Sequence, residues 1–270
     1  IASCLVGSEM CIRDSSIPLD RQSRPVLSNN GAMGAPLITE EPYASNGTVP
    51  VYDADAHIAE PTSVWEEYTD PKYRDLVMQC RPTGAADSVF VEDESMDTSA
   101  APACIPNAYG TNVTWDDIVP GSYDPVERLK VMDAEGLAAA LMFPSVHLMS
   151  GDISDGEVAA ANARGYNRWM SDFVSENPNR LFGVGVTPLQ SVDHAVAEIE
   201  FCAQAGLTGM TFRPERYNGL ELFSDEMDRV WATAEDHDMT VAIHGSFGSK
   251  MKSFARTRYT NQFYVHMVCH

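Results

Sequence analysis

The residues best suited to chemistry lie in one stretch, from Val51 to Glu60, which reads Val-Tyr-Asp-Ala-Asp-Ala-His-Ile-Ala-Glu. Side chains alternate between two faces in an extended strand, so Asp53, Asp55 and His57 would project from the same side. A half-buried strand normally carries large apolar groups on one face, and here both faces lack them. Carboxylates and an imidazole at this spacing suit a divalent cation, which takes oxygen and nitrogen ligands at about 2.0–2.2 Å. The stretch therefore predicts a metal-binding strand.

The overall charge narrows the classes of partner. The 270 residues include 39 acidic and 18 basic ones, for a formal net charge of −21, and 44% of the residues are hydrophobic. Such a charge repels the phosphates of nucleic acids and of anionic lipids. No apolar run approaches the roughly 20 residues that span a bilayer. We therefore expect a small-molecule substrate, no nucleic-acid partner and no membrane partner, and the formation of a homodimer stays open.

The cysteines indicate a reducing compartment. There are six of them, without a Cys-x-x-Cys pair and without regular spacing. A secreted disulfide framework is the alternative, but it belongs to shorter and more cysteine-dense chains. We therefore expect unpaired thiols and a cytoplasmic location.

The first 50 residues have the weakest relation to a folded domain. The segment from Glu9 to Ser15 resembles the translation of an adapter used in sequencing libraries, so we expect residues 1–15 to be non-native. A signal peptide is the alternative, but its apolar region would need about 7–15 residues, more than are present. Residues 16–50 contain five prolines among Ser, Asn and Gly without a sustained period, which predicts a flexible leader.

From residue 51 onward, strand-like and helix-like segments alternate, which predicts an α/β fold with a parallel sheet. Asp124-Pro125-Val126-Glu127 begins one helix and Ser154-Asp155-Gly156-Glu157 begins another, each with capping residues. The apolar run 137–143 predicts a strand buried on both faces. An insert over 80–123, with a single expected strand at 88–92, has the length of a lid. The pattern fits a (β/α)₈ barrel or a doubly wound sheet, and the glycine-rich loop typical of the latter is missing after the first strand.

Several short motifs, taken in their order and spacing, resemble one known family. They are Asp53-Ala54-Asp55-Ala56-His57 with Glu60-Pro61, Asp124-Pro125 with Arg128-Leu129, Met132-Asp133-x-Glu135-Gly136, Tyr166-Asn167-x-Trp169, Asn177-Pro178-Asn179-Arg180-Leu181, and Ala242-Ile243-His244-Gly245. The sequence is similar to the amidohydrolase-related family that includes aminocarboxymuconate-semialdehyde decarboxylase. The similarity extends over residues 51–270.

The resemblance implies a metal-dependent (β/α)₈ TIM barrel of the metal-dependent hydrolase type. In that family the first strand supplies two metal ligands, the fifth a histidine and the eighth an aspartate, and Asp55, His57 and His244 match the first three. Asp55 stands where the family often has histidine, which makes the ligand set harder and leaves zinc, manganese and iron all open. Of the three, zinc is the metal we expect. The chain carries about five βα units and no match to the eighth-strand aspartate, which leaves the catalytic residue unknown. We therefore expect a C-terminally truncated, inactive fragment of a longer enzyme.

Five other residues are candidates for binding a substrate. Arg213 ends a predicted strand and could bind a carboxylate, and an ion pair with nearby acids is the alternative. His147 follows a strand and could line a pocket or have no function. Glu60 could support the metal ligands or begin a helix. His266 and His270 have the i, i+4 spacing of metal ligands without the Glu of a His-Glu-x-x-His motif, which favours a substrate or structural role.

The function implied is metal-dependent hydrolysis or non-oxidative decarboxylation of a small carboxylated molecule, with aromatic acids among the candidates. Both reactions use a divalent metal as a Lewis acid, and they differ in whether water attacks or carbon dioxide leaves. The residues do not distinguish the two reactions. The alternative is a non-catalytic scaffold, or an inactive fragment without metal, in which Asp55 and His57 are structural.

Overall fold

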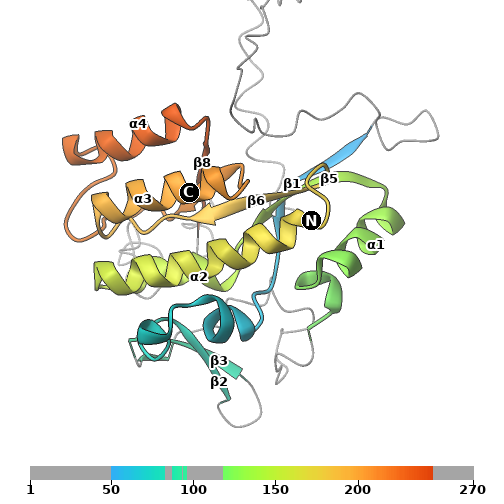
Figure 1. Ribbon diagram of the computed structural model, residues 1–270, viewed down its shortest axis with the longest axis horizontal. Coiled ribbons are helices and arrows are strands. Elements are labelled where there is room, and N and C mark those ends of the chain that lie inside the picture. The colour runs from blue at the N-terminus through green and yellow to red at the C-terminus, as the bar shows by residue number, and fades with distance from the viewer. Residues whose placement is uncertain (1–49, 83–86, 93, 96–117, 246–270) are drawn as a thin grey trace, which may run out of the picture. The chain divides into compact units, whose positions relative to one another are not determined.

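The computed structural model of the chain describes residues 50–82, 87–92, 94–95 and 118–245 (Figure 1). All of these lie in the larger of the two units into which the chain divides, which runs from Ala35 to His270. The predicted non-native segment, nearly all of the predicted leader, much of the predicted insert, and both His266 and His270 fall outside the described residues. The predictions for them remain predictions.

The main sheet has five parallel strands. They are β1 (Val51–His57), β5 (Leu137–Phe143), β6 (Leu181–Val186), β7 (Gly209–Phe212) and β8 (Thr240–Ile243). Each strand pairs with the next in the chain, so the order is β1-β5-β6-β7-β8. A doubly wound sheet would reverse its strand order partway, whereas a (β/α)₈ barrel adds every strand on the same side. The predicted partial barrel is therefore confirmed.

Four helices connect these strands, and their caps follow the predicted signals. They are α1 (Pro125–Glu135), α2 (Gly156–Ser175), α3 (Val192–Gln204) and α4 (Asp228–Asp236). The Asp124 side chain accepts a hydrogen bond from the amide of Glu127, as predicted. Asp155, rather than Ser154, caps α2 and accepts from the amides of Glu157 and Val158. An aspartate carboxylate can serve as the cap equally well, so the shift by one residue leaves the start of the helix intact.

The core lies between the sheet and α2. The aromatic side chains of α2, Tyr166, Trp169 and Phe173, recur at helical spacing and are buried on one face of the helix. Two glycines of β6 allow the helices to approach closely. A Cβ on Gly183 would lie 2.7 Å from Cγ of Met170, and one on Gly185 would lie 2.6 Å from Sγ of Cys202. Because real Cβ atoms do not approach so closely, glycine is needed at both positions for α2 and α3 to pack on β6.

The predicted insert contains more strand than expected. The strand expected at 88–92 is present as β3 (Asp87–Val91), but β2 (Gln79–Pro82) and β4 (Glu94–Ser95) flank it in a three-stranded antiparallel sheet. The expectation of a single strand in this region was therefore wrong. Strands of four and two residues are too short to show the alternation on which the sequence prediction relied.

Four short helical segments matter for the site or its surroundings. They are η1 (Val64–Tyr68), η5 (Pro120–Ser122), η6 (Val146–Asp152) and η7 (Asp225–Met227). η1 is a single π-helical turn with Ser63 at its N-cap position. η7 follows Ser224 and continues directly into α4. None of the described helices is long and apolar enough to cross a membrane.

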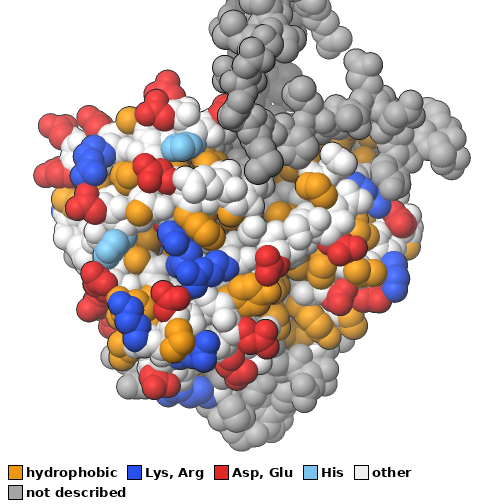
Figure 2. Space-filling view, viewed as in Figure 1, with side chains coloured by type: hydrophobic (Ala, Val, Ile, Leu, Met, Phe, Trp, Pro, Cys, Tyr) orange, Lys and Arg blue, Asp and Glu red, His pale blue; other side chains and the backbone are white. Residues whose placement is uncertain are grey.

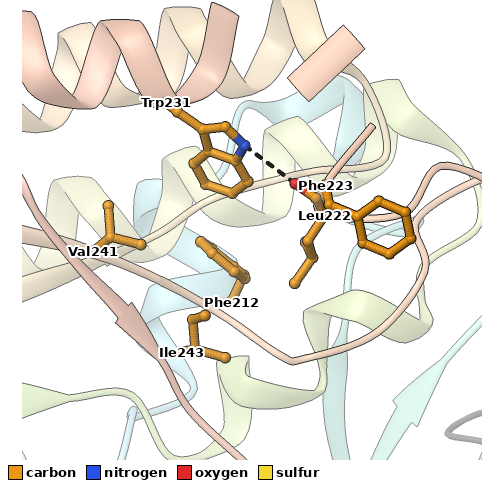
Figure 3. Close-up of a pocket in the computed structure, with 6 residues that line it drawn as sticks. All are labelled: Phe212, Leu222, Phe223, Trp231, Val241 and Ile243. Atoms are coloured by element: carbon orange, nitrogen blue, oxygen red, sulfur yellow. Dashed lines mark hydrogen bonds between the residues drawn. The ribbon is translucent and has the colours of Figure 1, made fainter. Parts of the chain in front are cut away.

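The surface combines charge with one apolar hollow. Figure 2 shows acidic, basic and hydrophobic side chains interspersed on the face that carries α2 and α3. A hollow of about 320 Å³ lies beside β8, lined by Phe212, Leu222, Phe223, Trp231, Val241 and Ile243 (Figure 3). The Trp231 indole donates to the carbonyl of Leu222 over 3.1 Å, which fixes one wall. Val241 and Ile243 belong to the outermost strand of the sheet and remain partly exposed.

Candidate metal centre

The sheet curls so that its two outer strands meet at their carboxyl ends. In a flat sheet β1 and β8 would be four spacings of about 4.8 Å apart, or about 19 Å. Instead, the ring centroids of His57 and His244 are 5.0 Å apart, and one ligand atom from each of Asp55, His57 and His244 falls within 4.8 Å of the others. The curvature of a barrel therefore brings together three residues that the sequence separates by almost two hundred positions.

The three side chains present the atoms that a metal requires. Nε2 of His57 lies 3.7 Å from Oδ1 of Asp55, and Nε2 of His244 lies 3.4 Å from the same oxygen. Ligands about 2.1 Å from a tetrahedral metal ion lie about 3.4 Å from one another. The spacing of the three atoms thus fits a divalent cation, and the mixed oxygen and nitrogen donors suit zinc, manganese or iron.

Backbone carbonyls hold both imidazoles in the orientation for metal binding. Nδ1 of His57 is 2.9 Å from the carbonyl oxygen of Pro144, and Nδ1 of His244 is 2.5 Å from that of Gly245. A carbonyl oxygen only accepts hydrogen bonds, so Nδ1 carries the proton in both rings. In the neutral rings Nε2 then has its lone pair directed at the site, an arrangement typical of metal-ligating histidines.

The electrostatics of the cluster favour one ion pair in the metal-free protein. The hydrogen bond with His244 lowers the pKa of Asp55, and its effect outweighs burial. Burial alone would lower the pKa of His244, but the interaction with Asp55 raises it. Burial and the neighbouring His244 lower the pKa of His57. A metal binding here would displace the proton of His244 and take over its interaction with Asp55.

Asp53 does not join this cluster, although strict alternation along the strand predicts that it faces the same side. The pairing of β1 with β5 shifts register between Asp53 and Ala56, and the Asp53 carboxylate accepts a hydrogen bond from the amide of Asp55. This irregularity breaks the two-residue period. Arg128, which belongs to one of the family motifs, donates to the carbonyl of His57 over 2.5 Å and so holds the end of the strand.

Glu60 and His147, two of the candidate substrate ligands, are fully buried behind the cluster. The Glu60 carboxylate accepts hydrogen bonds from the amides of Ser145, Val146 and His147, and from Nδ1 of His147 at 3.1 Å. The His147 ring stacks on Trp65, with 5.4 Å between centroids and 10° between planes. Both side chains are 0% exposed, which favours a supporting role over substrate contact.

The hydrogen bonds keep Glu60 ionised despite its burial. Burial by itself raises the pKa of a carboxyl group, but the side chain of His147 and the amides of His147 and Val146 together hold the pKa of Glu60 below its ordinary value of 4.5. The helix start that was considered for Glu60 is not observed, because η1 begins at Val64 after Ser63.

Arg213 also lies in the interior instead of lining a pocket. Its guanidinium, 1% exposed, donates to both oxygens of Asp152 at 2.9 and 3.2 Å and to Glu215 at 2.6 Å. A guanidinium with two carboxylate partners already in place has little capacity left for a substrate. The geometry therefore favours the ion pair that was the alternative for this residue.

The sequence contained little signal for the tertiary partners of the candidate residues. Pro144 and Gly245 act through backbone carbonyls, which every residue has, and Asp152 lies 61 positions from its partner Arg213. Such contacts follow from the tertiary arrangement. The position of Pro144 directly after a buried strand was the only hint, because polar contacts in barrels gather at carboxyl ends of strands.

The structure is similar to several solved structures, whereas no curated protein is significantly similar in sequence. An amidohydrolase from Mycobacterium avium subsp. paratuberculosis K-10 superposes with a TM-score of 0.59 and 20% identity, over 74% of this chain and 59% of that one. The 5-carboxyvanillate decarboxylase from Sphingomonas paucimobilis has a TM-score of 0.52 and 20% identity, over 78% of this chain and 56% of that one. At these identities the likeness shows the fold.

A third similar structure was solved with ligands. It is the 5-carboxyvanillate decarboxylase from Novosphingobium aromaticivorans, complexed with manganese and 4-hydroxy-3-methoxy-5-nitrobenzoic acid, with a TM-score of 0.52 and 17% identity over 78% of this chain and 54% of that one. This chain thus spans less than two thirds of the length of each of the three solved relatives.

The sequence also matches a family model, which is described as amidohydrolase, over residues 52–265. The match covers the parallel sheet, its connecting helices and the three clustered side chains, and so it includes more than half of the chain. The chain belongs to the amidohydrolase family.

Proposed function

We propose that this chain contributes the metal-binding part of an enzyme that hydrolyses or non-oxidatively decarboxylates a small carboxylated molecule. The observation that carries the proposal is the convergence of Asp55, His57 and His244, with both Nε2 atoms facing one carboxylate oxygen. Asp55 supplies a carboxylate oxygen, and Nδ1 of each histidine is already held by a backbone carbonyl. A metal would therefore find its three ligands arranged in advance.

We propose zinc as the metal, with manganese and iron as the competitors. A carboxylate and two imidazoles accept all three ions, and the solved structure of the Novosphingobium aromaticivorans decarboxylase contains manganese. When bound, a divalent ion supplies Lewis-acid chemistry, either polarising a substrate oxygen or activating water as a nucleophile. Asp55 would neutralise part of its charge, and the two histidines would bind as neutral ligands.

Decarboxylation of an aromatic acid is the reaction that we favour. Two of the three similar structures described above are decarboxylases of 5-carboxyvanillate, although the likeness is one of fold. The net charge of −21 repels a carboxylated substrate. A metal bound at the site would offset this negative charge where the substrate binds. Decarboxylation also needs an acid that protonates the product carbon, and the family resemblance implies an eighth-strand aspartate as the group that accepts protons.

Metal analysis tests the site directly. After purification of the full 270-residue chain and loading with zinc, we expect about one equivalent per chain by elemental analysis. Asp55→Ala and His244→Ala should lose it. His194→Ala is the matched control, because His194 is a partly exposed histidine whose Nδ1 also faces a carbonyl, that of Gly156, but it lies on α3 away from the cluster. No metal in the wild type, or equal metal in all variants, would favour the scaffold alternative.

The reaction is tested with labelled compounds. Release of labelled carbon dioxide from carboxyl-labelled 5-carboxyvanillate indicates decarboxylation, and incorporation of oxygen-18 from labelled water into the carboxylic acid formed from an ester or amide indicates hydrolysis. Because the chain spans less than two thirds of the length of its solved relatives, the assay uses both the 270-residue chain and a form extended to the length of those relatives. If a metal-loaded extended form yields neither product, the proposed activity is contradicted and only the proposed metal site remains.

A further inference from the structure

The buried Glu60 and the metal-ligand candidate His57 hold opposite ends of the same peptide unit. The amide of Ser145 donates to Glu60 at 3.2 and 3.3 Å, and the carbonyl of Pro144 accepts from Nδ1 of His57 at 2.9 Å. These two groups belong to the single peptide bond between Pro144 and Ser145. No cis peptide bonds occur in the described part of the chain, so this unit is planar and trans. Its N–H and C=O therefore point in opposite directions and rotate together.

The contacts of His57 and Glu60 are therefore coupled through one rigid peptide plane. A rotation of this peptide plane would withdraw the carbonyl from His57 and, at the same time, the amide from Glu60. Glu60 also accepts from the next two amides, those of Val146 at 3.0 Å and His147 at 2.9 Å, which start η6. Three successive amides bound to one carboxylate leave the plane no low-energy rotation, because each lost hydrogen bond would expose an unsatisfied group in a buried site.

The other contacts of the region leave this peptide unit to Glu60. Ile58 donates to the carbonyl of Phe143 at 3.2 Å and Ala59 to that of Ser122 at 2.8 Å, so the backbone of the segment after β1 is fixed by its own bonds. They align the strand end with β5 but do not act on the plane between Pro144 and Ser145. On that plane, Glu60 is the described side chain that binds the N–H.

Building on the metal-dependent function proposed above, we propose that Glu60 is a positioning residue for the metal centre. It fixes the Pro144–Ser145 peptide so that the carbonyl of Pro144 keeps the proton of His57 on Nδ1 and leaves Nε2 for the metal. The sequence of contacts runs from the Glu60 carboxylate through the peptide plane to the ring of His57. Glu60 itself contacts neither metal nor substrate, because it is fully buried.

The direct test is the tautomer of His57 in the metal-free chain. Two-dimensional ¹H–¹⁵N correlation of the imidazoles, with His57 assigned from a His57→Asn variant, should show the Nδ1–H tautomer in the wild type. Glu60→Gln should give a mixture of tautomers, since an amide offers one acceptor and its NH₂ repels the backbone donors. The zinc affinity, measured by competition with a chelator, should fall about 10- to 100-fold.

Glu198→Gln is the matched control for a general loss of stability. Glu198 is also a buried carboxylate that accepts from several donors, Arg164 and Asn167, but it lies on α3 and does not contact the residues around His57. We expect this variant to lose stability while both the tautomer of His57 and the zinc affinity stay as in the wild type. Equal effects of the two substitutions on His57 would overturn the proposal.

Two further outcomes are decided in advance. If Glu60→Gln does not fold, Glu60→Asp retains the charge but withdraws the oxygens by one methylene, and the same shift in tautomer is expected; a wild-type tautomer in that folded variant overturns the proposal. If the wild type binds no zinc, the proposed function fails, and a shifted tautomer in the variant still supports the positioning contact. An unchanged tautomer in Glu60→Gln contradicts the positioning role whatever the metal result.

Discussion

Two groups of ionisable side chains at the carboxyl ends of the strands use the same residue types in opposite ways. At the candidate metal centre, the side chains of Asp55, His57 and His244 are 58, 27 and 23% exposed, and the Nε2 atoms of the two histidines lie 3.7 and 3.4 Å from Oδ1 of Asp55. By contrast, Glu60 and His147 are 0% exposed, and four donors in the described part of the chain bind the Glu60 carboxylate.

The difference lies in how completely each carboxylate is satisfied. The Glu60 carboxylate accepts hydrogen bonds from backbone amides and from His147, so its charge stabilises the backbone conformation. Its oxygens are occupied by these donors and are not available to a ligand. Asp55 faces the nitrogens of two imidazoles, of which one has a raised pKa and one a lowered pKa. The proposed cation would complete its arrangement. Burial with full hydrogen bonding thus marks support, and partial exposure with convergent donors marks binding.

The largest effect on stability is expected at Arg213, which belongs to the buried class. Arg213→Met leaves Asp152 and Glu215 without their cation, and we expect a loss of about 3–5 kcal/mol in the free energy of unfolding. Urea denaturation measures it. Arg229→Met is the control, since Arg229 and Asp193 form an exposed ion pair that contributes less than about 1 kcal/mol. Similar losses in both variants would remove the distinction between buried and exposed pairs.

The next effect is expected at Glu60 and depends on pH. Its folded pKa is depressed, so its contribution is present above the unfolded pKa and is lost as the pH falls through the folded pKa. Glu60→Gln should therefore cost about 3 kcal/mol at neutral pH, and the gap to the wild type should narrow below about pH 4. Urea denaturation at a series of pH values measures the gap.

Glu198 provides the opposite sign for comparison. Burial raises its pKa, and the hydrogen bond from Asn167 and the interaction with Arg164 offset this only in part. Its ionisation in the folded state therefore opposes folding, and the gap between wild type and Glu198→Gln should narrow as the pH rises above the ordinary value of 4.5. A gap that changes with pH in the same direction for both glutamates would contradict this contrast.

A smaller loss is expected from Gly151→Ala, which probes how tightly the buried ion pairs are packed. A Cβ there would lie 2.0 Å from Oε1 of Glu215 and 2.7 Å from Nη2 of Arg213. Because both side chains are held by each other, we expect a cost of about 1–3 kcal/mol by thermal or urea unfolding. Gly156→Ala is the control, since its nearest contact is an ordinary 3.4 Å to Cβ of Ser191. An equal loss of stability at both glycines would show that the side chains of Arg213 and Glu215 rearrange at little cost to accommodate the new methyl group.

The smallest effect on stability is expected at Asp55, in the partly exposed class. Asp55→Asn removes an interaction with His244 that solvent screens, so the metal-free chain should lose about 1 kcal/mol or less. Metal binding should nevertheless be lost, since the carboxylate is one of three ligands. Unfolding with and without zinc measures both quantities: zinc should stabilise the wild type and leave Asp55→Asn unchanged. A large loss in the metal-free variant would place Asp55 among the structural carboxylates.

Much of the fold could be predicted because its signals are local. The strand over 137–143 was predicted with the bounds that β5 has, and Asp124 and Asp155 cap helices at or within one residue of the expected positions. Capping and apolar periodicity depend on neighbours within a few residues, so the sequence contains them directly. The strands β2 and β4 escaped prediction because they are stabilised by pairing with β3.

The same distinction between local signals and tertiary contacts applies to the candidate site. The sequence by itself determined the residue types at 55, 57 and 244, and hence that a divalent cation could be bound once these residues met. Tertiary structure decided that they meet, because the curl of the sheet brings β1 and β8 together. It also decided that Arg213, His147 and Glu60 face inward to partners up to 87 positions away. Burial and donor direction are properties of the packed chain, and a sequence records only which groups are present.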